Sequence, residues 1–296
     1  MTQPHEHYYV PAQSKWPIIA TLGMGTSVYG LATWFNDMSA QRADSNGPLI
    51  FSIGGLFLAY MLFGWFGAVI KESRAGLYRA QRGGSCCWGL GWFLFSEVMF
   101  LAAVVGALFY VRTFAGPWLG GDGAKGVANM LWPNFEYVWP LLQTPDPKLF
   151  PAPKEVIDPW HLPLLNTVLL VSSSVTLTIA HHALKHGKRA LLKAWLALTI
   201  VLGVTFLGFQ AVEYVEAYRE LGLTLGSGIY GSTFFMLTGF HGAHVTLGTV
   251  MLAVMLVRIL RGHFDAELQF GFEAASWYWH FVDVVWIALF VFVYVL

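Results

Sequence analysis

Two histidines interrupt an otherwise apolar stretch of the chain, LTGFHGAHVTLG at residues 237–248. His241 and His244 are three residues apart, and this spacing places both side chains on one face of a helix. Imidazole is the commonest metal ligand, and it gains or loses a proton near neutral pH. The pair could therefore hold a haem or a metal, transfer protons, or pack and hydrogen-bond inside a helix bundle.

As a metal site the pair is incomplete. A structural zinc site needs four ligands, typically with help from cysteine or carboxylate. A bis-histidine haem needs ligands from different helices, and His280 or the doublet His181–His182 could supply them. No spacing among these residues selects a haem. Packing and hydrogen bonding are therefore the favoured interpretation, and we expect no metal in this chain.

Carboxyl groups also fall within apolar stretches, where burying a charge is expensive. Glu97 in GWFLFSEVMFLAAVVGALFY has no basic residue within a helical turn. It could relay protons, face a polar cleft, or stay neutral and hydrogen-bond to a neighbouring helix. Glu213 and Glu216 approach a helix end, where hydration predicts an ordinary interfacial role. Four further residues are expected to form a structural polar clamp between helices: His241, Glu273, His280 and Asp283.

These residues must be positioned by helices that span a membrane. Of the 296 residues, 56% are hydrophobic and only 11% are charged, whereas soluble domains carry about 25% charged residues. Backbone polar groups in lipid must be satisfied internally, so the spans are predicted to be helices. The expected fold class is an all-α polytopic membrane protein, N-terminus inside and C-terminus outside as the Lys and Arg distribution indicates. Seven stretches reach the roughly 20 apolar residues that a span requires: 16–35, 48–70, 88–112, 161–184, 194–217, 230–258 and 275–296.

Polar segments complete the predicted domain organisation. Residues 1–15 form a polar arm, 71–87 an inner basic loop, and 113–160 an outer loop too rich in Pro and Gly to sustain a helix. Net charge is zero, and no charged block indicates a nucleic-acid partner. Cys86 and Cys87 are adjacent and lack the spacing of a metal or redox motif, so we expect free thiols.

Three segments resemble subunit III of the haem–copper oxidases. They are LLNTVLLVSSSVTLTIAHHAL (164–184), GIYGSTFFMLTGFHGAHVTLGTVML (228–252) and FGFEAASWYWHFVDVVWIALFVFVYV (270–295). FLFSEVMF around Glu97 and AVIKES (68–73) extend the resemblance towards the N-terminus. Seven spans are similar to the cytochrome c oxidase branch, and subunit III of a related quinol oxidase is the alternative.

The resemblance implies a division of labour. Haem and copper belong to partner subunits I and II in this family, so the chain would hold phospholipids but no redox centre and no catalytic residue. Helices 1–2 (16–70) and helices 3–7 (within 88–296) would form two groups with a lipid-holding cleft between them. The chain would contact mainly subunit I, sustain its proton uptake and stability, and meet cytochrome c only through the complex. We expect a bacterial inner membrane rather than the mitochondrial inner membrane.

Residue roles also follow from the resemblance. Glu97 resembles the family's buried carboxyl, and His5 and His7 resemble a histidine-bearing arm that serves as a proton antenna. Cys87 stands where a basic residue is usual, which Arg79 or Arg82 could replace, and Gly106 stands where a tryptophan is frequent. Phospholipid binding would fall to six residues: Lys71, Glu97, His244, Arg258, Arg261 and His263.

Two other classes of protein fit part of the pattern. A stand-alone dihaem membrane protein would use His241, His280 and the doublet at 181–182. A multipass transporter would use Glu97 as a proton-coupled carboxyl, but the sequence lacks the internal repeat that is typical of such folds.

Overall fold

The computed structural model describes residues 13–42, 44–74, 80–123, 128–149, 151–262 and 270–296. All regular elements in these ranges are helices: α1 (Trp16–Ser39), α2 (Gly47–Arg74), α3 (Ala80–Tyr110), the π-helix η1 (Val111–Ala115), α4 (Gly116–Leu119), α5 (Ala128–Leu131), α6 (Leu162–Lys185), α7 (Arg189–Arg219), α8 (Gly228–Leu260), α9 (Phe270–Leu289) and the π-helix η2 (Phe290–Val295). Seven segments of the described chain are long and apolar enough to cross a membrane, and each overlaps one predicted span. The prediction of an all-α polytopic membrane protein with seven spans is confirmed.

The third span is longer than predicted. α3, η1 and α4 follow one another directly, and the apolar segment covers Gly84–Leu119. The expectation that 113–160 cannot sustain a helix was therefore wrong for its first residues and for α5. Pro117 lies in the first turn of α4, directly after η1. The other described residues of this segment form turns and irregular chain.

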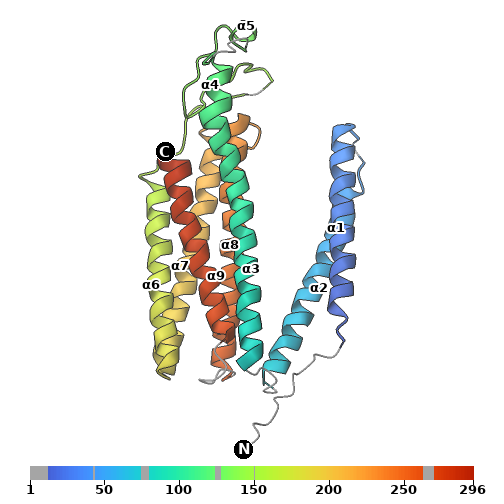
Figure 1. The fold of residues 1–296 in the computed structure, drawn as a ribbon, viewed down its shortest axis with the longest axis vertical. Coiled ribbons are helices and arrows are strands. Elements are labelled where there is room, and N and C mark those ends of the chain that lie inside the picture. The colour runs from blue at the N-terminus through green and yellow to red at the C-terminus, as the bar shows by residue number, and fades with distance from the viewer. Residues whose placement is uncertain (1–12, 43, 75–79, 124–127, 150, 263–269) are drawn as a thin grey trace, which may run out of the picture. The chain divides into compact units, whose positions relative to one another are not determined.

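The chain divides into two compact units, Met1–Gly83 and Gly84–Leu296. In the first unit α1 and α2 pack side by side as a hairpin (Figure 1). Small residues allow this approach: a Cβ atom at Gly54 of α2 would overlap the hydroxyl of Ser27, and one at Gly30 of α1 would overlap the backbone of α2. Close contact through small residues is a common way for membrane helices to associate.

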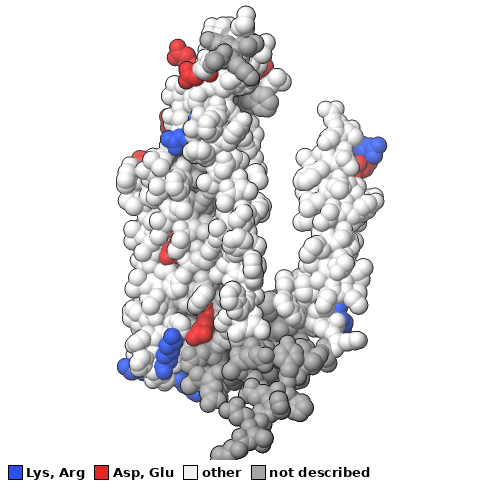
Figure 2. Space-filling view, in the orientation of Figure 1, with Lys and Arg blue, Asp and Glu red and all other residues white. Residues whose placement is uncertain are grey.

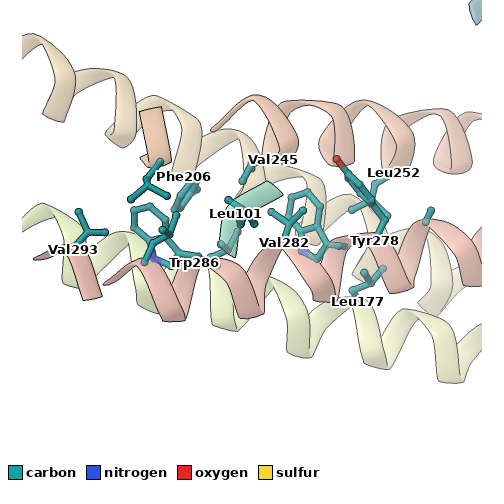
Figure 3. Packing of buried hydrophobic residues seen from close by; sticks show 14 of the residues in the cluster. Leu101, Leu177, Phe206, Val245, Leu252, Tyr278, Val282, Trp286 and Val293 are labelled. Atoms are coloured by element: carbon teal, nitrogen blue, oxygen red, sulfur yellow. The ribbon is translucent and has the colours of Figure 1, made fainter. Parts of the chain in front are cut away.

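The second unit is a bundle of α3 and α6–α9 (Figure 1). Helix α9 contacts α6 and α8, and its indoles Trp279 and Trp286 are 1% and 0% exposed. Figure 3 shows Trp286 beside Phe206 of α7, with Val245 and Leu252 of α8 further along the same core. α9 therefore supplies the two largest fully buried side chains of the bundle core.

The described part of the α4–α6 link packs near the bundle end that carries the C-terminus (Figure 1). The Tyr137 hydroxyl donates to the carbonyl of Arg112 at 2.7 Å, and the tyrosine ring occupies the space that a Cβ at Gly116 would take. The ring centroid of Trp139 lies 5.4 Å from the guanidinium carbon of Arg112. The same ring packs edge-on against Tyr230 at the start of α8. Burial raises the pKa of Tyr137, so this phenol remains a neutral donor at physiological pH.

Charged side chains gather towards the ends of the helices, and the visible middle of each unit carries few of them (Figure 2). In the bundle, one set of Lys and Arg residues lies at the end opposite the C-terminus: Lys185, Lys188, Arg189, Arg258 and Arg261. The positive-inside rule places such an end in the cytoplasm or its equivalent. The expected orientation of the termini stays a prediction, which this distribution favours.

Candidate functional site

Glu97 and His244 come together between α3 and α8. The Nε2 atom of His244 lies 3.1 Å from Oε2 of Glu97, and the side chains are 17% and 19% exposed, respectively. Phe100 packs edge-on against Phe240 one turn away, with ring centroids 4.8 Å apart. Glu97 has no basic residue within a helical turn on α3. Its partner, His244, comes from a different helix and is far along the sequence.

His241 does not share this site with His244. Its Nε2 lies 3.2 Å from the carbonyl oxygen of Val282 in α9 and can only donate to it. The ring lies 5.8 Å from that of Phe206 and 4.9 Å from that of Trp286, centroid to centroid. His241 is 1% exposed, and packed aromatic rings lie against it on α7 and α9.

His280 and Asp283 lie on α9, and both contact α6. The hydroxyl oxygen of Ser174 in α6 lies 2.8 Å from Nδ1 of His280. The same hydroxyl forms a hydrogen bond with the buried Asp283 carboxyl. A single serine of α6 therefore contacts two polar residues that are three apart on α9.

Two indoles extend the contact between α6 and α9. The Nε1 atom of Trp279 donates to the hydroxyl of Ser173, and that of Trp286 donates to the hydroxyl of Thr167, both at 2.9 Å. Indole N–H groups in an apolar interior need an acceptor, and α6 supplies one for each. We call this set of hydrogen bonds the α6–α9 seam.

The doublet His181–His182 divides between two environments. His181 points towards α9, with Nε2 3.7 Å from Oε1 of Glu273. His182 is exposed and lies beside His186, with ring centroids 4.1 Å apart. The four residues of the predicted clamp thus contact three different partners: the Val282 carbonyl, His181 and Ser174.

The prediction of an interfacial role was wrong for Glu213. It is 1% exposed, and the hydroxyl of Tyr294 donates to its Oε1 at 2.6 Å. Glu213 is buried near the end of α7 at Arg219, whereas Glu216 is exposed. No local signal separates the two glutamates, because Gln210, Glu213 and Glu216 follow one another at equal three-residue steps.

The remaining residues assigned to phospholipid lie near helix ends. Lys71 is exposed in the last turn of α2, Arg258 is half-buried in the last turn of α8, and Arg261 is exposed at its C-cap. Four sequence candidates lie outside the described residues, as does the side chain of Arg82: His5, His7, Arg79 and His263.

Metal ligation finds little support in the described ranges, where no three or more His, Cys, Asp or Glu side chains gather as a metal site would require. Cys86 and Cys87 are free thiols, as their adjacency predicts. Most hydrogen bonds of the buried polar side chains go to one another or to backbone carbonyls. Their chemistry is that of interhelical hydrogen bonding, and the Glu97–His244 contact is the more exposed one.

Comparisons with known proteins give a consistent result. A sequence model of the family described as cytochrome c oxidase subunit III matches residues 141–296. The chain is 37% identical to cytochrome c oxidase subunit 3 of Prototheca wickerhamii over 293 residues, which cover 97% of this chain and 96% of the relative. It is 38% identical to that of Formosania lacustris over 288 residues (97% and 96%), and 36% identical to that of Arabidopsis thaliana over 296 residues (99% and 98%). The likeness therefore extends over both units.

Proposed function

The chain belongs to the cytochrome c oxidase subunit III family, and we propose that it serves as subunit III of a cytochrome c oxidase. The observation that carries this proposal is the near-full-length similarity to relatives that bear this name. The complex would oxidise cytochrome c, reduce oxygen to water and translocate protons, with haem and copper in subunits I and II. These relatives favour cytochrome c over a quinol as the electron donor.

Within the complex the chain would sustain subunit I rather than carry electrons. The side chains of His241 and His280, which a dihaem protein would need, are engaged by Val282 and Ser174. Seven spans make the chain an integral membrane protein. A bacterial inner membrane stays our prediction for its location, and the eukaryotic relatives named above lend it no support.

Phospholipid binding is the second part of the proposal. Lys71 and the pair Arg258 and Arg261 are basic residues at helix ends, and such positions attract anionic headgroups. Glu97 and His244 would contact lipid as well, since their mutual contact leaves each side chain partly accessible. His5, His7 and His263 keep the roles that the family resemblance implies, as proton antenna and lipid contact.

The proposed function is tested on the purified complex. Removing this chain should leave the initial rate of oxygen reduction largely intact but shorten the active lifetime during turnover. Glu97→Gln should retain most oxygen-reducing turnover, because the carboxyl contacts His244 and lipid rather than lying on a proton path. Ser96→Ala, a neighbouring exposed position on α3, is the matched control. Immediate loss of most turnover in Glu97→Gln alone, or a Soret band in the isolated chain, would contradict the proposal.

A further inference from the structure

A second polar cluster lies at the bundle end that carries the C-terminus. It comprises Asn166 of α6, Gln210 and Glu213 of α7, and Tyr294 of η2, and all four side chains are buried. Asn166 is close to the start of α6 and Tyr294 is close to the end of the chain, so the cluster joins three elements at one level of the bundle. We call it the Glu213 cluster.

Its hydrogen bonds converge on one carboxyl oxygen. The Tyr294 hydroxyl donates to Oε1 of Glu213 at 2.6 Å, and Nε2 of Gln210 donates to the same atom at 3.4 Å. Nδ2 of Asn166 donates to Oε1 of Gln210 at 3.5 Å. Oε2 of Glu213 and Oδ1 of Asn166 are both buried without a hydrogen-bond partner.

An ionised carboxylate fits these surroundings poorly. A buried charge is tolerated when a counter-charge and hydrogen bonds compensate its lost hydration. Among the described residues, no Lys, Arg or His forms an ion pair with Glu213, and Glu216 on the same helix adds a like charge. The carboxylate would also leave Oε2, one of its two charged oxygens, unsatisfied.

Neighbouring titratable groups do not alter this balance. From α7, Glu216 contributes negative charge and Tyr214 is engaged with Thr238 of α8 through its hydroxyl, 2.7 Å away. From η2, Tyr294 already donates to Oε1. In α6 the residue that contacts the cluster is the uncharged Asn166. None of these groups supplies positive charge to Glu213.

We propose that the Glu213 cluster is a proton-binding site, in which Glu213 carries its proton on Oε2 in the folded chain. A proton there converts an unsatisfied acceptor into a donor, and Oδ1 of Asn166 is the acceptor that the same cluster leaves without a donor. Oε1 then becomes the carbonyl oxygen that receives the Tyr294 hydroxyl. The proton thereby supplies a donor to a cluster whose hydrogen bonds already connect α6, α7 and the C-terminal turn.

Infrared difference spectroscopy of the intact complex tests this assignment. Wild type minus Glu213→Gln should contain the carbonyl stretch of a protonated carboxylic acid at neutral pH, shifted downwards in deuterium oxide. Glu216→Gln, an exposed carboxylate on the same helix, is the matched control and should show a loss of carboxylate bands alone. Loss of a carboxylate band in Glu213→Gln would overturn the proposal. A Glu213 carboxylate band that shifts when Na⁺ is replaced by Ca²⁺ would also overturn it, because such a shift indicates a metal-cation site.

Tyr294→Phe provides a second test that keeps Glu213 in place. Removing the hydroxyl takes away the short hydrogen bond to Oε1, and a carbonyl freed of a hydrogen bond vibrates at a higher frequency. The protonated-acid band should therefore shift upwards in Tyr294→Phe. An unshifted band would mean that Oε1 is not the carbonyl oxygen of a neutral acid.

Discussion

The fit of Trp279 between three helices offers the sharpest test of the bundle. This indole of α9 is 1% exposed and donates to Ser173 of α6. A Cβ built at Gly203 of α7 would lie 2.7 Å from its Cη2 atom, and one at Gly248 of α8 would lie 2.9 Å from its Cε3 atom. Two glycines on two helices therefore create the slot that the ring occupies.

Gly203→Ala should destabilise the bundle although alanine is the better helix former. The helix propensity gain is about 1 kcal/mol, while overpacking a well-packed interior typically costs about 1–3 kcal/mol. The clash is hard to relieve, because the indole is fixed by its hydrogen bond and Thr249 blocks the same space 3.1 Å from the added Cβ. Gly208→Ala on the same helix meets nothing within 4 Å. We expect Gly203→Ala to be less stable than Gly208→Ala by about 1–3 kcal/mol.

A double-mutant cycle isolates the cause. Trp279→Phe removes the far edge of the indole, so Gly203→Ala should cost clearly less in that background, where the contact with Thr249 remains. The free energy of unfolding can be measured on the full chain in lipid bicelles by denaturant titration with pulse proteolysis. Equal effects of Gly203→Ala with Trp279 and with Phe at 279 would refute the reasoning, as would equal stabilities of the two alanine variants.

Three further predictions concern other parts of the chain. Gly54→Leu should separate α1 from α2 and expose the hairpin to protease, whereas Gly55→Leu, where a Cβ meets nothing within 4 Å, should behave as wild type. Tyr137→Phe should speed hydrogen exchange around Arg112 about fivefold, because the loss of one hydrogen bond costs about 1 kcal/mol. Burial raises the pKa of Tyr137, so the contribution of this hydrogen bond to stability is complete below pH 10 and declines only as pH rises further. Arg258→Ala should release a bound phospholipid from the complex, counted by native mass spectrometry, and an unchanged count would contradict the headgroup role.

The seven spans could be predicted because hydropathy over about 20 residues is a local property of the sequence. Helix ends could not be predicted as well, since they depend on capping and on neighbours. Proline and glycine predicted no helix after residue 112, yet η1 and α4 continue the span past Pro117 to Leu119. Glu213 looked interfacial because it lies near the end of α7, yet its side chain is buried among residues of other helices.

Pairings between helices lay beyond the sequence. Glu97 and His244 were both singled out as polar groups in apolar surroundings, but nothing local indicates that α3 lies beside α8 at that level. His241 and His244 share a helix face by spacing, yet a three-residue step turns the two rings to different neighbours. His241 reaches α9 and His244 reaches α3.

The polar contacts are distributed unevenly over the bundle, and the effect of a substitution should therefore depend on which helix carries it. α6 and α9 are joined by several hydrogen bonds of the α6–α9 seam, each worth about 0.6 kcal/mol in a membrane. α3 buries few side chains within the chain and meets its neighbours through isolated contacts: Glu97 with His244, Phe93 with Tyr278, and Phe100 with Phe240. Substitutions on α3 should therefore change how the chain binds lipid or a partner subunit more than they change the fold of α6–α9.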